Sequence, residues 1–105
     1  MPGPPEVGPP VSWFHAVWVS ASDDEAVEWY DEVDGLRWSI RCVRKFRDGT
    51  AKAYSYASSD WRSEMPDQPI PPLEEINENP DFVAREISKQ EFELVWEKAV
   101  HEMKP

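Results

Sequence analysis

The sequence predicts an α+β fold, in which an antiparallel meander of four to five strands carries a short helix and a C-terminal helix, both packed on one face. Two observations support this fold class. Runs rich in β-branched and aromatic residues are separated by Asp-Gly turn signals, which is typical of β-hairpins. The last segment instead repeats apolar residues at helical spacing behind a capping box. A chain of 105 residues has room for one domain.

The chain opens with a proline-rich segment, MPGPPEVGPP, which holds five prolines and two glycines. Such a segment offers few backbone donors and little apolar mass. We therefore expect residues 1–11 to form a disordered lead and residues 12–105 to form a single α+β domain.

The first strand is predicted over Ser12–Val19, whose sequence SWFHAVWV is rich in aromatic and β-branched residues. Alternation places Trp13 on one face and Trp18 on the other, so both faces are apolar. With helices on one face only, one of these tryptophans must stay uncovered. Whichever of the two faces outward is a candidate anchor for a partner, and Trp18 is included among the predicted binding residues.

The first hairpin is predicted from Asp34-Gly35, which separates the strand-like runs Ala26–Val33 and Leu36–Phe46. A two-residue loop fixes the register and gathers the apolar residues on one face. Each Glu–Arg pair across this ladder contributes about 0.2 to 1 kcal/mol. The ladder opposes Glu32 to Arg37, Trp29 to Ile40, Glu28 to Arg41 and Val27 to Cys42.

The second hairpin follows from the turn signal at 47–49, which ends in Gly49. A three-residue loop with Gly49 in the left-handed region places Tyr54 opposite Cys42 and extends the apolar face. The next strand is therefore predicted over Thr50–Ala57.

The second half of the chain contains one long loop and three shorter elements. Proline and polar residues predict a loop over Ser58–Pro72, and flanking prolines delimit a short helix over Leu73–Asn77. Phe82–Ile87 is expected to add an edge strand. A capping box and apolar residues at helical spacing predict a helix over Ser88–Met103.

Composition excludes several classes of partner. The chain has 21 acidic and 11 basic residues and a formal net charge of −10, so its surface repels nucleic acid and anionic membranes. Cys42 is the single cysteine, which excludes an internal disulfide. With no signal-peptide pattern and no long apolar run, the expected location is the cytoplasm.

The residues do not assemble a recognisable catalytic centre. Cys42 falls on the predicted core face, where a thiol behaves as a small apolar residue. We expect His15 to be a partly buried histidine with its hydrogen bonds satisfied, although it could serve as a base if it met Cys42. No spacing of ligand residues indicates a metal, and no glycine-rich loop indicates a bound nucleotide. The sequence therefore predicts no catalytic residues, metal or cofactor.

Charge segregation is the strongest functional signal. Bases gather on the predicted third strand, whereas Ser58–Asp81 holds seven acids against Arg62 alone. One interpretation is solubility together with pairing to those bases. The other is an acidic surface that attracts a basic protein, with tryptophans as anchors. The predicted binding residues are Trp18, Asp60, Trp61, Glu64, Asp67, Glu74, Glu75 and Glu78.

The order of motifs also resembles an uncharacterised bacterial domain family known as a domain of unknown function. The stretches that carry the resemblance are 28–33, 37–49, 70–77 and 86–96. The resemblance extends from about Trp13 to Val100 and implies a fold, but no assigned activity and no catalytic residues. The proline-rich lead departs from the family pattern.

The preferred interpretation is a non-enzymatic binding protein, an immunity-like or antitoxin-like neutraliser of a basic protein. Two alternatives remain open. One is a small-ligand binder or minor enzyme with a pocket between sheet and helix, near His15 and Tyr54. The other is a structural homodimer formed through an aromatic sheet face. The chain itself is expected to be a monomer or a homodimer.

Overall fold

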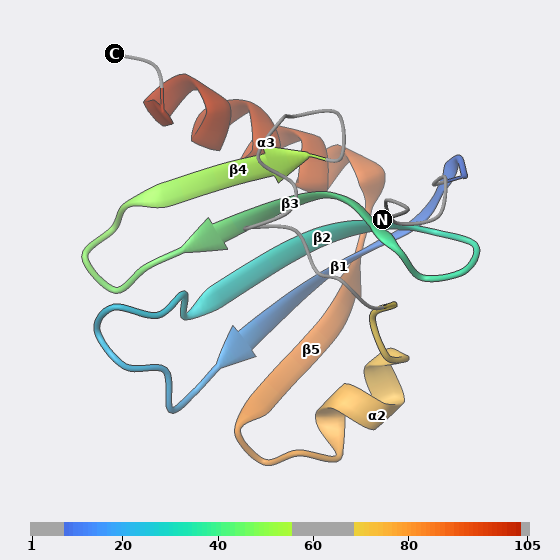
Figure 1. Cartoon of the computed structure of the whole chain (residues 1–105), viewed down its shortest axis with the longest axis horizontal. Coiled ribbons are helices and arrows are strands. Elements are labelled where there is room, and N and C mark those ends of the chain that lie inside the picture. The colour runs from blue at the N-terminus through green and yellow to red at the C-terminus, as the bar shows by residue number, and fades with distance from the viewer. Residues whose placement is uncertain (1–7, 56–68, 104–105) are drawn as a thin grey trace, which may run out of the picture.

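The computed structural model describes residues 8–55 and 69–103, which form a five-stranded antiparallel sheet and two helices (Figure 1). This confirms the predicted α+β fold class. In chain order the elements are β1 (Pro10–Trp18), β2 (Glu28–Asp34), β3 (Ser39–Lys45), β4 (Ala51–Ser55), α2 (Leu73–Asn77), β5 (Phe82–Ile87) and α3 (Lys89–Met103).

Four strands follow the chain as the predicted meander, and β5 completes the sheet beside β1. The order is β4-β3-β2-β1-β5, with every pair antiparallel. β1 therefore lies inside the sheet, which suits a strand that is apolar on both faces. It begins at Pro10, two residues before the predicted start. Residues 1–7 of the predicted lead lie outside the described residues.

Each face of the sheet is covered by a different helix. α3 packs on the face that carries Tyr30, where Phe92 is fully buried. α2 packs on the opposite face, where Ile76 lies against the cluster around Phe14. The prediction that both helices share one face is wrong. Because the apolar side chains of β1 alternate between the two faces, each face needs its own cover.

The register of the first hairpin also differs from the prediction. β2 ends at Asp34 and β3 begins at Ser39, which leaves a four-residue turn rather than a two-residue one. Glu32 consequently lies opposite Arg41 rather than Arg37. The other predicted pairs are shifted too, with Trp29 opposite Arg44 and Glu28 opposite Lys45.

The carboxylate of Asp34 accounts for this wider turn. Its Oδ1 accepts hydrogen bonds from the N–H groups of Leu36 and Trp38, both at 2.9 Å. Its Oδ2 accepts one from the N–H of Gly8 at 3.0 Å. Burial alone would raise the pKa of Asp34, but these backbone donors outweigh burial and hold the pKa below its usual 3.8. An ionised Asp34 therefore stabilises the turn.

The second hairpin follows the prediction. Gly49 has φ of 91°, in the region that favours glycine, and Tyr54 lies opposite Cys42. The described part of β4 ends at Ser55.

The two helices and β5 form where the sequence predicts them. α2 and β5 have the predicted bounds. At the start of α3 the N–H of Glu91 donates to Oγ of Ser88 at 3.0 Å, as expected for an N-cap. The side chain of Glu91 does not close the capping box and instead accepts a hydrogen bond from Arg85 at 2.9 Å. Ile87 and Phe92 pack in one buried cluster, which confirms the hydrophobic staple.

Candidate functional site

A hollow of about 280 Å³ lies between α2 and the face of the sheet opposite α3. We call it the α2 groove. Phe14 and Ala16 of β1, Trp29 of β2 and Phe82 of β5 line it from the sheet, and Ile76 lines it from α2. Its lining is almost entirely apolar, with Glu75 and Asn79 as the polar members.

The side chain of Asn77 fixes α2 to β5. Its Nδ2 donates to the carbonyl of Ala84 at 2.9 Å, and its Oδ1 accepts from the N–H of Ala84 at 2.7 Å. One side-chain amide thus takes both backbone bonds that a neighbouring strand would make. None of the five residues of α2 is buried. The helix is therefore held at the edge of the sheet while the groove remains beneath it.

Arg37 fixes the segment that leads into α2. Its Nε donates to the carbonyl of Ile70 and its Nη2 to the carbonyl of Pro71, both at 2.8 Å. The N–H of Ile70 in turn donates to the carbonyl of Arg37 at 2.7 Å. Arg37 adopts φ of 68°, a left-handed conformation that costs a non-glycine residue about 1 to 2 kcal/mol. These three hydrogen bonds offset that cost.

An aromatic cluster adjoins the groove. Trp18 stacks on Phe82 with ring centroids 5.8 Å apart, and Trp29 meets both rings edge-on at 6.2 and 5.9 Å. These two rings leave Trp18, one of the predicted binding residues, partly exposed. It remains at the surface beside the groove, since Phe82 belongs to both.

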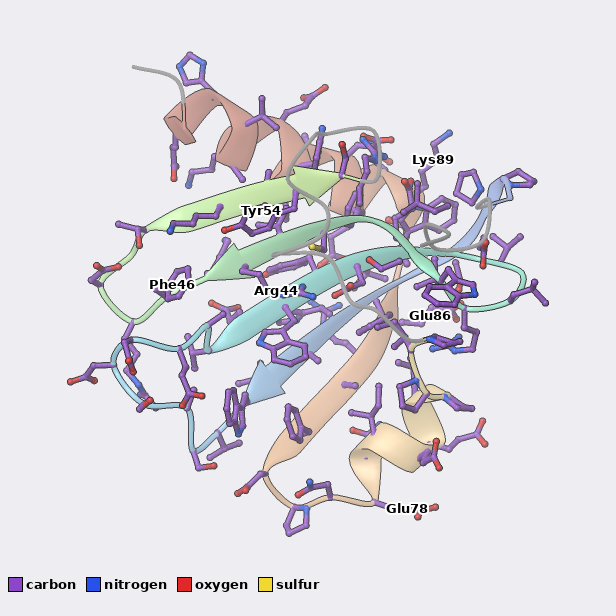
Figure 2. The ribbon with its side chains drawn as sticks, viewed as in Figure 1. Arg44, Phe46, Tyr54, Glu78, Glu86 and Lys89 are labelled. Atoms are coloured by element: carbon purple, nitrogen blue, oxygen red, sulfur yellow. The ribbon has the colours of Figure 1, made fainter. Side chains whose placement is uncertain are left out.

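The acidic residues predicted on the short helix are all exposed. Glu74 and Glu75 project from α2, and Glu78 is the C-cap residue that follows it, as Figure 2 shows at the end of the helix. With Asp81, they make four acids and no base in the segment 72–81. The other predicted binding residues lie outside the described residues: Asp60, Trp61, Glu64 and Asp67.

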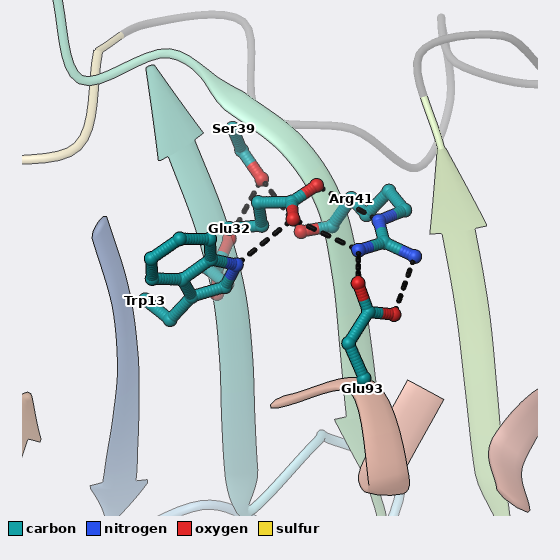
Figure 3. Close-up of polar contacts among 6 residues, drawn as sticks. Trp13, Glu32, Ser39, Arg41 and Glu93 are labelled. Carbon is teal, nitrogen blue, oxygen red and sulfur yellow. Dashed lines mark hydrogen bonds and ion pairs between the residues drawn. The ribbon is translucent and has the colours of Figure 1, made fainter. Parts of the chain in front are cut away.

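The two arginines of β3 pair with other carboxylates. Arg41 binds Glu32 of β2 and Glu93 of α3, each with a shortest contact of 2.8 Å (Figure 3). Arg44 binds the fully buried Asp31 at 2.8 Å. Within residues 8–55 and 69–103, no ion pair reaches an acid of α2. The charge of α2 is therefore not neutralised by the part of the fold described.

The contacts around Arg41 clamp α3 to the sheet. Its guanidinium lies over the rings of Phe92 and Trp96, at 5.1 and 4.9 Å from their centroids. Glu32 also accepts from Nε1 of Trp13 at 2.8 Å (Figure 3). Burial alone would raise the pKa of Glu32, but the hydrogen bonds from Arg41 and Trp13 outweigh it and keep the pKa below 4.5. These paired groups stabilise the fold.

The titratable residues on the α3 face do not form a catalytic set. Nε2 of His15 lies 3.0 Å from Oε1 of Glu28, and its ring stacks on Tyr30 at 4.3 Å, so the prediction of a satisfied histidine is confirmed. Burial, followed by the charge of Glu28, raises the pKa of Tyr30 to about 12. Cys42 and Tyr54 occupy the opposite face. A pair between Cys42 and His15 is thereby excluded, as is one pocket shared by His15 and Tyr54.

Two further properties hold for residues 8–55 and 69–103. There, no group of three His, Cys, Asp or Glu side chains is placed to hold a metal ion. Neither helix has the length and apolar character needed to cross a bilayer.

The sequence did not lead us to predict the groove, although it contained part of the pattern that forms it. Alternation correctly placed Phe14, Ala16 and Trp18 on one face of β1. Both helices were expected on one face of the sheet, and the sequence did not decide which face of β1 they cover, so these apolar residues were not joined to Ile76 of α2. Treating both apolar faces of an inner strand as faces that need cover would have placed α2 over this face.

Comparison with known proteins gives one match. A family model described as "Domain of unknown function (DUF6881)" matches residues 11–101, as the resemblance in the sequence led us to expect. No curated protein and no solved structure matches the chain.

Proposed function

The chain belongs to this family of unknown function, and we propose that it is a non-enzymatic binding protein that uses the surface around α2 to bind and neutralise a basic protein. Immunity proteins and antitoxins act in this way. The observation that carries the proposal is the set of exposed carboxylates on Glu74, Glu75 and Glu78, beside a partly exposed aromatic cluster.

The physical basis is charge complementarity. Acids concentrated on one surface accelerate the approach of a basic protein and repel acidic ones. The segment 72–81 offers four such acids, and Arg41 and Arg44 of β3 are bound to other carboxylates. Asp60, Glu64 and Asp67, with Trp61, precede α2 in the chain and are proposed to extend the same surface. Trp18 supplies an indole ring, and tryptophan is enriched among the residues that contribute most to the binding energy of protein interfaces.

Capture from the native host tests the proposal. The wild type is compared with the variant Glu74→Gln, Glu75→Gln, Glu78→Gln. The control carries Asp23→Asn, Glu97→Gln and Glu102→Gln, which remove the same charge from exposed positions outside α2. We expect wild type and control to retain a basic protein that is released at high salt, and the α2 variant to lose it. Equal retention by the α2 variant would contradict the proposal.

Small-ligand binding is a second candidate, favoured by the volume of the α2 groove. About 280 Å³ is close to the lower limit of roughly 300 Å³ for small-molecule sites. Such sites also need several polar groups to orient the ligand, and the groove offers Glu75 and Asn79. A basic protein partner therefore fits the surface better.

A further inference from the structure

We propose that the α2 groove receives one apolar side chain of the basic partner, and that lysine or arginine residues flanking this side chain pair with Glu75 and Glu78. This assignment rests on the binding function proposed above and specifies what the surface recognises. The partner would present a leucine, isoleucine, methionine or phenylalanine within a basic segment.

The chemistry of the lining requires an apolar occupant. Ala16 is 2% exposed and lies opposite Trp29, and its small side chain leaves space between larger neighbours. An unpaired polar group placed there would lose its hydrogen bonds to water without replacement. An apolar side chain would instead gain contact with Trp29, Ile76 and Phe82, which line the groove and are only half-buried.

The rim of the groove supplies the charge. Glu75 lines the groove and also belongs to the exposed acids of α2. Glu78 follows three residues later, so the two side chains are neighbours on the helix, with Cβ atoms about 5 to 6 Å apart. In an extended segment, residues rise about 3.3 Å each. Cations one or two residues from the anchor would therefore reach these carboxylates.

The same charges decide between possible occupants. A second copy of this chain would bring its own acids against Glu75 and Glu78, and like charges oppose that contact. A basic segment removes this repulsion and gains ion pairs at the rim. The observations thus favour a basic polypeptide.

Synthetic peptides provide a direct probe. The peptide Lys-Lys-Leu-Lys-Lys is compared with Lys-Lys-Ser-Lys-Lys and with Ser-Ser-Leu-Ser-Ser. Binding is followed by tryptophan fluorescence and by the methyl resonances of Ala16 and Ile76. We expect the basic leucine peptide to bind about tenfold more tightly than the serine peptide, because leucine leaves water on entering the groove. The uncharged peptide should be the weakest of the three.

Filling the groove should abolish the preference for leucine. Ala16→Leu fills it from the sheet, and Ile76→Phe fills it from α2 in case the first variant fails to fold. Val83→Leu is the control, since Val83 lies on the opposite face of β5 and is 60% exposed. We expect both filling variants to bind the two basic peptides equally, whereas the control keeps the tenfold difference.

The possible outcomes separate this inference from the function on which it rests. If both basic peptides bind the wild type equally and neither binds the variant Glu75→Gln, Glu78→Gln, the groove does not receive an apolar side chain. The proposal that the acidic surface binds a basic protein would then still stand. Failure of both basic peptides to bind would overturn the acidic surface as well. Equally tight binding of the uncharged leucine peptide would overturn the basic partner. A dimer in light scattering that Ala16→Leu dissociates would make a second copy the occupant.

Discussion

The two faces of this sheet differ in how completely they are covered. On one, the fifteen-residue α3 buries Phe92 and Ala99, and Arg41 joins helix to strands through Glu93. On the other, the five-residue α2 buries none of its residues and stands above a hollow. The two faces therefore differ in how tightly their helix packs on the sheet. The α3 face stabilises the fold, and the α2 face retains an apolar hollow, at which we propose that a partner binds.

The α2 face is nevertheless anchored beside the groove. Asp31 is fully buried, where it accepts from Oγ of Ser39 at 2.9 Å and from Nη1 of Arg44 at 2.8 Å. The guanidinium of Arg44 also lies over the ring of Trp29, at 4.7 Å from its centroid. This network holds β2 and β3 together without α2. The groove can therefore stay open without loosening the sheet.

The largest expected effect is a difference in stability between two variants, each with one apolar side chain truncated on a different face of the sheet. Phe92→Ala should lower the free energy of unfolding by about 3 to 5 kcal/mol, because Phe92 is fully buried. Ile76→Ala should cost about 1 kcal/mol, since Ile76 is half-buried and already borders a hollow. Urea denaturation followed by circular dichroism measures both. Equal losses would refute the division between the faces.

The next effect concerns the contacts of Arg41 that join α3 to the sheet. Arg41→Met should cost about 2 to 3 kcal/mol at neutral pH, because Glu32 is left buried without its partner.

This loss should depend on pH. The folded-state pKa of Glu32 lies below 4.5, so the stability it contributes is present above that value and disappears as the pH falls through the lowered pKa. Wild type and Arg41→Met should therefore converge in unfolding free energy as the pH falls from 4.5 through the lowered pKa of Glu32. A constant difference would mean that Arg41 acts through packing alone.

A smaller and more local effect is expected at the attachment of α2. Asn77→Ala removes both hydrogen bonds to Ala84 and should cost about 1 to 2 kcal/mol. Hydrogen exchange at the Ala84 amide should accelerate, while exchange in α3 stays unchanged. Asn77→Asp keeps the acceptor for that amide and should protect it in part. Faster exchange throughout α3 would show that the two faces are coupled.

The smallest effect is expected at the start of α3. Ser88→Ala removes the acceptor for the N–H of Glu91 and should cost about 0.5 to 1 kcal/mol in urea denaturation. Ser88→Asp retains an acceptor and serves as the control. Peptide binding at the α2 groove should be the same in both variants. A change in binding would again connect the faces.

Local signals predicted most of the elements. The bounds of α2 and β5, the cap at Ser88 and the turn at Gly49 each depend on residues close in the chain. The predicted register of the first hairpin was wrong because the carboxylate of Asp34 accepts hydrogen bonds from the N–H of Trp38 and of the distant Gly8. These bonds outweigh the local preference of Asp-Gly for a tight turn.

The site was predictable only in part, for a similar reason. The acids of α2 could be read from composition, and Glu74, Glu75 and Glu78 are indeed exposed. The hollow beside them could not be predicted from the sequence, because its size depends on the distance between α2 and Ala16. That spacing is set by the bonds of Asn77 to Ala84 and of Arg37 to Ile70, which join segments with no shared local pattern.

The side chain of Asn77 also bears on the behaviour of the protein in a crowded solution. A lone strand at the border of a sheet exposes backbone groups on which a stray chain can nucleate aggregation. Asn77 occupies the N–H and the carbonyl at Ala84, in the middle of β5. The small helix that we propose to bind a partner thereby also covers backbone groups on which uncontrolled self-assembly could begin.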